Sequence, residues 1–212
     1  MSASVLTAPS AAARGSRELP ATARALPSRA AARGRRVALA AWCLTGLGAA
    51  AAAAAYRAGY RLNLTPSVPV GLWRLTAGAV PRRGEVALWC PPDAPVFRTA
   101  RSRGYLPRGG CPGGYVPLFK PVAALAGDLV TVTPAAIAVN GVPLPRTGQM
   151  VLDGTGRTLP RVAPGTYRVR PGEVWFVSSY NGRSFDARYY GPMPAARIQG
   201  VLRPVLTRGY TE

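Results

Sequence analysis

Residues Leu129 to Val142 read LVTVTPAAIAVNGV, and their pattern sets the fold class. Leu129 to Thr133 is rich in β-branched residues, which is typical of a strand. Ile137 to Val139 form a second β-prone run that leads directly into Asn140-Gly141, a dipeptide favoured in two-residue hairpin turns. We therefore expect antiparallel strands in this part of the chain.

The same organisation extends outward on both sides. Short β-prone runs follow turn-forming Gly and Pro residues, and none of the segments beyond residue 57 shows a sustained helical period with caps. The sequence predicts a mainly antiparallel β domain over residues 57–212, without a large inserted second β region. The further runs are Val86–Trp89, Val174–Ser178 and Val201–Leu206.

Ahead of this domain lies an uncharged stretch, Val37 to Tyr56, which reads VALAAWCLTGLGAAAAAAAY. As a helix it would span roughly 30 Å, the thickness of the hydrocarbon layer of a bilayer. We expect a transmembrane anchor over residues 37–56. A buried Ala-rich helix and a cleaved signal peptide are the alternatives, but this run is longer than a usual signal core and follows 36 residues of polar tail.

Basic residues predict the orientation of this anchor. Arg33, Arg35 and Arg36 directly precede it and should remain in the cytoplasm, although Arg57 and Arg61 follow it. Residues 1–36 are rich in Ala, Ser, Pro and Arg, and we expect a disordered cytoplasmic tail. The domain that follows would then lie on the extracytoplasmic side.

Composition excludes several classes of function. The net charge is +19, but the basic residues are scattered, without the clustered basic and aromatic side chains of a nucleic-acid site, so we expect no nucleic-acid partner. The chain has no histidine, which removes Ser-His-Asp catalysis and His-ligated metals. Its eight acidic residues form no close cluster, so neither a metal nor another cofactor is expected.

Two stretches carry residues suited to nucleophilic catalysis. In Asn63 to Trp73, NLTPSVPVGLW, prolines on both sides hold Ser67 on a stiff, non-helical loop. In Leu118 to Asp128, LFKPVAALAGD, the single lysine of the chain, Lys120, lies among apolar neighbours. Desolvation would lower its pKa towards the range of a general base, which no arginine can reach. An ordinary turn serine and an incidental surface lysine are the alternatives.

A third stretch, Asn181 to Gly191, reads NGRSFDARYYG. If it is extended, alternate residues place Ser184, Asp186 and Arg188 on one face, where Asp186 and Arg188 can pair. A polar strand edge is the plainer interpretation. Outside the anchor, Cys90 and Cys111 are candidates for a disulfide in an oxidising compartment, with two buried free thiols as the alternative.

In this order, the three stretches resemble the Ser/Lys signal peptidases, and most closely the TraF-type peptidases of conjugative transfer. TPSVPVGLW resembles the nucleophile motif, FKPVAALAGD the lysine motif and SFDARYYG the closing motif. Ala187, Ala126 and Val68 depart from common residues of these motifs. The resemblance covers about residues 60–205.

The resemblance implies a role for each site residue. Ser67 would be the nucleophile and Lys120 the general base, with Asp186 as a required acid. The Ser67 backbone N–H and the Thr65 hydroxyl would stabilise the oxyanion. Ser184 would orient Lys120, and Arg188 would pair with Asp186.

The expected protein is thus a single-pass endopeptidase of the bacterial inner membrane, with its catalytic domain in the periplasm. Its partners would be the lipid bilayer and an exported, pilin-like or signal-peptide-bearing precursor, bound as an extended strand. A general signal peptidase I and a non-catalytic membrane-anchored assembly factor are the alternatives. A LexA-type self-cleaving regulator uses the same Ser/Lys pair, but it needs a soluble DNA-binding module where this chain has a tail and an apolar run.

Overall fold

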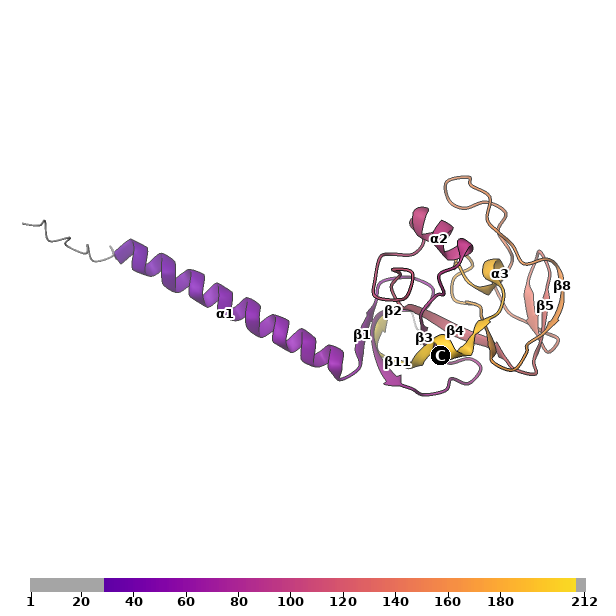
Figure 1. Ribbon diagram of the computed structural model, residues 1–212, viewed down its shortest axis with the longest axis horizontal. Helices are drawn as coiled ribbons and strands as arrows, with labels where there is room; N and C mark the ends of the chain where they lie inside the picture. The colour runs from indigo at the N-terminus through magenta and orange to yellow at the C-terminus, as the bar shows by residue number, and fades with distance from the viewer. Residues whose placement is uncertain (1–28, 209–212) are drawn as a thin grey trace, which may run out of the picture. The chain divides into compact units, whose positions relative to one another are not determined.

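Within residues 29–208, which the computed structural model describes, the chain forms one long helix followed by two antiparallel sheets (Figure 1). The larger sheet has the order β1-β2-β11-β3-β4-β9-β10, and the smaller has the order β7-β6-β5-β8. The predicted mainly antiparallel β fold is confirmed. The strands of the larger sheet are β1 (Tyr60–Asn63), β2 (Val70–Ala77), β3 (Val86–Trp89), β4 (Leu118–Leu125), β9 (Glu173–Phe176), β10 (Met193–Pro194) and β11 (Ile198–Arg208).

The smaller sheet is a second β region that the sequence analysis did not describe. It contains the stretch with which the sequence analysis began, and its strands are β5 (Leu129–Val132), β6 (Ile137–Val139), β7 (Val142–Pro143) and β8 (Gly165–Arg168). The hairpin at Asn140-Gly141 is confirmed, because β6 and β7 pair directly across it and both turn residues have positive φ, 50° and 80°. β8 joins this sheet from much farther along the chain, and the sequence pattern gave no signal for that pairing.

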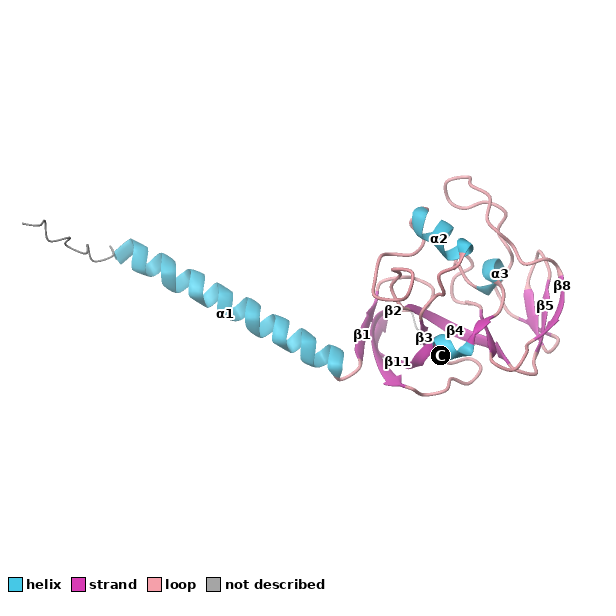
Figure 2. Cartoon of the chain, viewed as in Figure 1, coloured by secondary structure: helices cyan, strands magenta, loops and turns pink. Residues whose placement is uncertain are grey.

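Short helices also interrupt the β pattern, and the sequence analysis missed them. They are α2 (Pro95–Ser102), α3 (Ala187–Tyr190) and the 3-10 turn η1 (Ala195–Arg197). Figure 2 shows α2 and α3 as short helices, each flanked by loops. α2 starts with Pro at its first turn and buries Phe97 and Ala100, so tertiary packing stabilises a segment too short to show a helical period.

The long helix α1 (Arg29–Arg57) contains the predicted anchor. Its segment Arg33–Arg57 has 25 residues and contains an 18-residue window with a mean hydropathy of 1.8 and no buried positions, so it is long and apolar enough to cross a membrane. A signal sequence meets the same criteria, and anchoring therefore remains a prediction. The expected disorder over residues 1–36 is wrong for residues 29–36, because the good helix formers Ala and Arg continue the helix through the charged flank. Residues 1–28 lie outside the described part.

Strand β4 connects the core to the site. It pairs with β3 on one side and, from Val122 onward, with β9 on the other. Trp89 of β3 stacks on Phe176 of β9 at 4.9 Å between ring centroids, and Phe97 of α2 packs edge-on against Trp89. This aromatic packing fixes the strand on which Lys120 lies.

Candidate active site

The loop of residues 64–69, between β1 and β2, carries Ser67 and is held by a buried side chain that the sequence analysis did not single out. Asn63 Nδ2 donates to the carbonyl oxygens of Thr65, Val68 and Pro69 at 2.8, 3.1 and 3.0 Å. Its Oδ1 accepts from the Thr65 N–H at 3.1 Å. Because Pro66 and Pro69 have no N–H, this loop cannot join a strand ladder, and the Asn63 amide stabilises its shape instead.

Lys120 lies beside Ser67, as the sequence analysis expected. Its Nζ is 2.7 Å from Ser67 Oγ and 2.9 Å from Ser184 Oγ, and the side chain is 4% exposed. The two serine hydroxyl groups are 3.1 Å apart. A protonated Nζ donates to both oxygens, whereas a neutral Nζ can accept the Ser67 hydroxyl proton across the same short distance.

Burial lowers the pKa of Lys120 to about 8. Desolvation of the ammonium is the main cause, the negative charge of Asp186 opposes it by raising the pKa, and the positive charge of Arg188 lowers it further. A substantial fraction of Lys120 is therefore neutral near pH 8. This is the form that a general base requires.

Asp186 and Arg188 form a fully buried ion pair behind these groups. Arg188 Nε donates to Asp186 Oδ1 at 2.8 Å, and its Nη2 donates to Oδ2 at 2.9 Å. Both side chains are 0% exposed. In the described part of the chain, the carboxylate of Asp186 makes no hydrogen bond to Ser67 or Lys120, so it acts on Lys120 through its charge.

The Arg188 guanidinium also binds backbone carbonyl oxygens of the loop that carries Ser184 and of the loop around Gly148. It donates to the carbonyl oxygens of Gly182 and Ser184 at 2.9 Å each, and to that of Gly148 at 3.3 Å. The expected alternation of an extended segment is wrong here. Asp186 is the N-cap of α3 and accepts a hydrogen bond from the Arg188 N–H. A helical turn therefore brings the Asp186 carboxylate and the Arg188 guanidinium together.

The two groups predicted to stabilise the oxyanion, the Thr65 hydroxyl and the Ser67 backbone N–H, differ in whether they are already hydrogen-bonded. The Thr65 hydroxyl donates to Asn63 Oδ1 at 3.0 Å, so in this structure its proton points into the loop. The backbone N–H of Ser67 has no acceptor in the described part of the chain. This N–H is therefore the group that remains free to bind a developing negative charge.

A second residue missed by the sequence analysis is Ser178, which is 0% exposed. Its hydroxyl donates to the backbone carbonyl oxygen of Ser67 at 2.6 Å, and its N–H donates to Asp186 Oδ2 at 3.0 Å. No sequence signal distinguishes it from its neighbour Ser179. Asn63, by contrast, directly precedes the Pro-containing loop and could have been suspected as a loop-stabilising residue.

Ser67 and Lys120 open into a cavity of about 290 Å³. Its remaining wall comes from residues 105–106, 150–159 and 181–189, and a hydrogen bond from the Tyr105 hydroxyl to the Asp153 carboxylate joins the first two of these segments. The aromatic and apolar lining residues are Tyr105, Leu106, Met150, Leu159, Phe185 and Tyr189. Ser67 and Lys120 thus lie beside a partly apolar wall.

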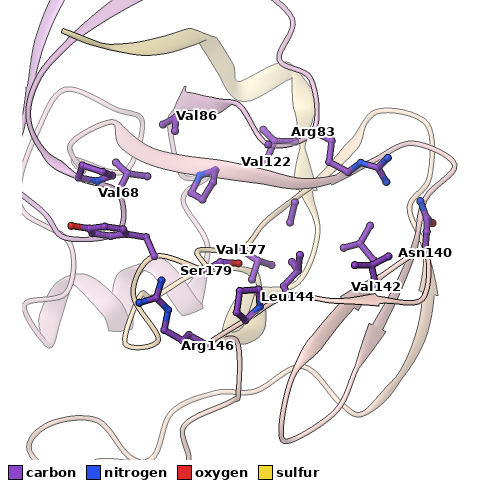
Figure 3. Close-up of a pocket in the computed structure, with 17 residues that line it drawn as sticks. Val68, Arg83, Val86, Val122, Asn140, Val142, Leu144, Arg146, Val177 and Ser179 are labelled. Carbon is purple, nitrogen blue, oxygen red and sulfur yellow. The ribbon is translucent and has the colours of Figure 1, made fainter. Parts of the chain in front are cut away.

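A larger, mostly apolar groove of about 670 Å³ starts at Val68, the residue after the serine. Figure 3 shows its wall of Val86, Val122, Val177 and Leu144. Neither Ser67 nor Lys120 lines it. The loop between β1 and β2 thus contributes to both hollows, with Thr65 to Ser67 lining the cavity and Val68 and Pro69 lining the groove.

The structure joins Cys90 and Cys111 in a disulfide, with a Cα–Cα distance of 5.4 Å. Cys90 directly follows β3, and Cys111 lies in the loop that leads to β4. Cys43 is exposed and free in α1. The residues described contain no group of three or more His, Cys, Asp or Glu side chains that could hold a metal ion.

Residues 35–206 match the protein family described as signal peptidase, peptidase S26. The chain therefore belongs to the S26 signal peptidase family. This agrees with the resemblance that its three motifs show.

Its relatives include proteins of plasmid transfer. The chain is 43% identical to the plasmid transfer protein TraF of Escherichia coli over 157 residues, which cover 74% of this chain and 88% of the relative. It is also 43% identical to the conjugal transfer protein TraF of Agrobacterium tumefaciens over 156 residues, or 73% and 86% of the two chains. A signal peptidase I structure from Enterococcus faecalis matches with a TM-score of 0.34 and 20% identity, over 58% of this chain and 97% of that one.

Proposed function

We propose that this protein is a membrane-anchored serine endopeptidase that uses Ser67 and Lys120 to cleave the leader peptide of an exported precursor. The observation that carries this proposal is the 2.7 Å contact between Ser67 Oγ and the buried Lys120 Nζ. With a pKa of about 8, Lys120 can accept a proton at physiological pH, which its ordinary pKa would not allow.

The reaction follows from these positions. Neutral Lys120 accepts the Ser67 hydroxyl proton while Ser67 Oγ attacks the scissile carbonyl carbon. The Ser67 N–H stabilises the oxyanion, and the Lys120 ammonium then gives its proton to the leaving amine as the C–N bond breaks. A second nucleophile releases the acyl group from Ser67 by the reverse sequence. Ser184 keeps Nζ directed at Ser67 Oγ throughout.

The printed names of the relatives concern plasmid and conjugal transfer, which favours a precursor of that apparatus, such as a pilin. In this proposal α1 spans the inner membrane once, and the β domain meets the precursor on the periplasmic side. The general signal peptidase I remains the neighbouring alternative. The genes beside this one separate the two, because pilus and secretion-channel genes favour the dedicated enzyme.

Co-expression with the pilin precursor of the same transfer system tests the proposal. We expect a shortened product in the mass spectrum with the wild-type chain, and unprocessed precursor with Ser67→Ala or Lys120→Arg. Arginine keeps the positive charge but cannot lose its proton, so this variant isolates the base function. A product lighter by one further water molecule indicates that an amine of the same chain, not water, accepts the acyl group. Processing that survives Ser67→Ala contradicts the proposal.

A small acyl donor tests the chemistry without the precursor. 4-Nitrophenyl acetate should transfer its acetyl group to Ser67 Oγ, releasing 4-nitrophenolate, and intact mass then counts the acylated protein. We expect this adduct to be absent in Ser67→Ala. Transfer function that persists in vivo in Ser67→Ala, with no adduct on the wild type, would instead favour the non-catalytic assembly factor.

A further inference from the structure

The loop that carries Ser67 has few internal hydrogen bonds, so its shape depends on groups outside it. Asn63 binds the carbonyl oxygens of Thr65, Val68 and Pro69, but not that of Ser67 itself. The Ser67 carbonyl is bound instead by Ser178, which lies 111 positions later in the sequence. At 2.6 Å this is a short hydroxyl-to-carbonyl bond between buried groups.

Ser178 is itself fixed at its backbone. Its N–H donates to Asp186 Oδ2 at 3.0 Å, and its hydroxyl oxygen accepts from the Asn181 N–H at 3.2 Å. The same Asp186 carboxylate is held by Arg188. A chain of buried hydrogen bonds therefore runs from the Asp186–Arg188 pair through Ser178 to the main chain of the nucleophile.

We infer that Ser178 is a positioning residue for the nucleophile, and this inference rests on the proposed function. Its hydroxyl fixes the peptide plane that follows Ser67, and with it the direction of Ser67 Oγ and of the free Ser67 N–H. Ser178 makes no hydrogen bond to Lys120, so its effect passes through the geometry of Ser67 and not through the base. A displacement of about 1 Å at a reacting group can lower a rate by roughly 100-fold.

The test uses the full chain and 4-nitrophenyl acetate. Acetyl transfer forms a bond from Ser67 Oγ to the acetyl carbon, passes the hydroxyl proton to Lys120 Nζ and expels 4-nitrophenolate. Stopped-flow release gives the acylation rate constant and the apparent dissociation constant of the probe, while the plateau of intact mass gives the fraction of active protein. These three quantities separate positioning from folding.

For Ser178→Ala we expect an acylation rate constant lower by roughly 10- to 100-fold, with the dissociation constant of the probe unchanged. The midpoint of the pH profile should stay where it is in the wild type, because the neighbours of Lys120 are intact. Ser178→Thr retains a hydroxyl and should recover most of the rate, while Ser178→Cys, which has a similar size but is a weak donor, should not.

Thr133→Val is the control for the loss of a hydroxyl group away from the site. The Thr133 hydroxyl also makes two hydrogen bonds, both to Ala136 across the exposed turn between β5 and β6, and its loss should leave the acylation rate constant unchanged. A Ser178→Ala protein that loses only active fraction, at a wild-type rate constant, overturns the inference and assigns Ser178 a structural role. A shifted pH midpoint overturns it as well, because Ser178 would then act through Lys120.

The same measurements distinguish a failure of the proposed function from a failure of the inference about Ser178. If the wild-type chain gives no adduct that depends on Ser67, the peptidase proposal fails and the positioning role fails with it. If Ser67→Ala abolishes acylation while Ser178→Ala acylates at the wild-type rate, only the inference about Ser178 is refuted.

Discussion

At the scale of single residues, Lys120 combines the proposed role of general base with a cost in stability. An unfolded chain holds its proton up to a pKa near 10.5, whereas the folded protein holds it only up to about 8. Between these values the unfolded state binds more protons, so stability rises with pH across this window. Below about pH 8 the full penalty applies.

We therefore predict that Lys120→Met is more stable than the wild type at pH 7, by up to about 3 kcal/mol. Methionine has a similar length and carries no charge to desolvate, and Ser67 and Ser184 can still bond to each other. Urea unfolding at pH 7 and at pH 10 measures the effect, which should shrink at the higher pH. A variant that is less stable than the wild type at both pH values contradicts the prediction.

The negative charge of Asp186 raises the pKa of Lys120 and so opposes the effect of burial. Its removal in Asp186→Asn leaves the Arg188 cation, which lowers the pKa of Lys120 unopposed. We expect the midpoint of the acylation pH profile to move below about 8. We also expect a loss of about 3–5 kcal/mol in stability, because a buried charge is left unpaired.

Only folded molecules are acylated at Ser67, and the rate constant does not depend on how many of them there are. Partial unfolding of Asp186→Asn therefore does not obscure the shift in the midpoint of the pH profile. A profile with an unchanged midpoint and a lower rate at every pH would contradict the electrostatic role. It would favour direct participation of Asp186 in proton transfer instead.

At the scale of elements, the disulfide joins the end of β3 to the loop that leads into β4, across 21 residues that include α2. Closing a loop of this size contributes about 3 kcal/mol in the chain-entropy account. We predict that Cys90→Ser lowers the unfolding midpoint in urea, whereas Cys43→Ser in α1 leaves it unchanged. Alkylation with and without prior reduction, read by mass, checks that the bond forms in the exported protein. An alkylated Cys90 without reduction argues for two free thiols.

The contrast between predicted and observed elements has a local explanation. Asn140-Gly141 fixes its own backbone geometry, so the hairpin between β6 and β7 can be predicted from two residues. The helices α2 and α3 depend on contacts with distant residues, since Phe97 and Tyr190 pack on Trp89. Such contacts do not show in a window of neighbouring residues.

The same reasoning explains what could be predicted of the site. Ser67 and Lys120 stand out by chemistry, the first between prolines and the second as the single lysine. Ser178 reaches the nucleophile loop through a bond to a carbonyl 111 positions away, and the hydroxyl of Thr65 is directed by Asn63. The proposed reacting groups can thus be recognised in the sequence, whereas most of the groups that hold them can be recognised only in the fold.

At the scale of the whole molecule, the proposed function depends on which side of the membrane the β domain occupies. Arg33, Arg35 and Arg36 precede the apolar part of α1, and the positive-inside tendency retains them in the cytoplasm. The disulfide agrees with an oxidising compartment for the domain. Both features predict an N-terminus inside and a domain outside.

Protease treatment of spheroplasts that express the full chain with an N-terminal epitope tests this orientation. We expect external protease to remove the β domain and leave a short fragment that carries the epitope and α1, because only the domain is accessible. Permeabilised cells should lose the epitope as well, which is the control for access. A domain that resists protease until the cells are permeabilised places it in the cytoplasm. The Ser67–Lys120 pair would then face no exported precursor, and the proposed substrate class would have to be abandoned even if the acylation chemistry held.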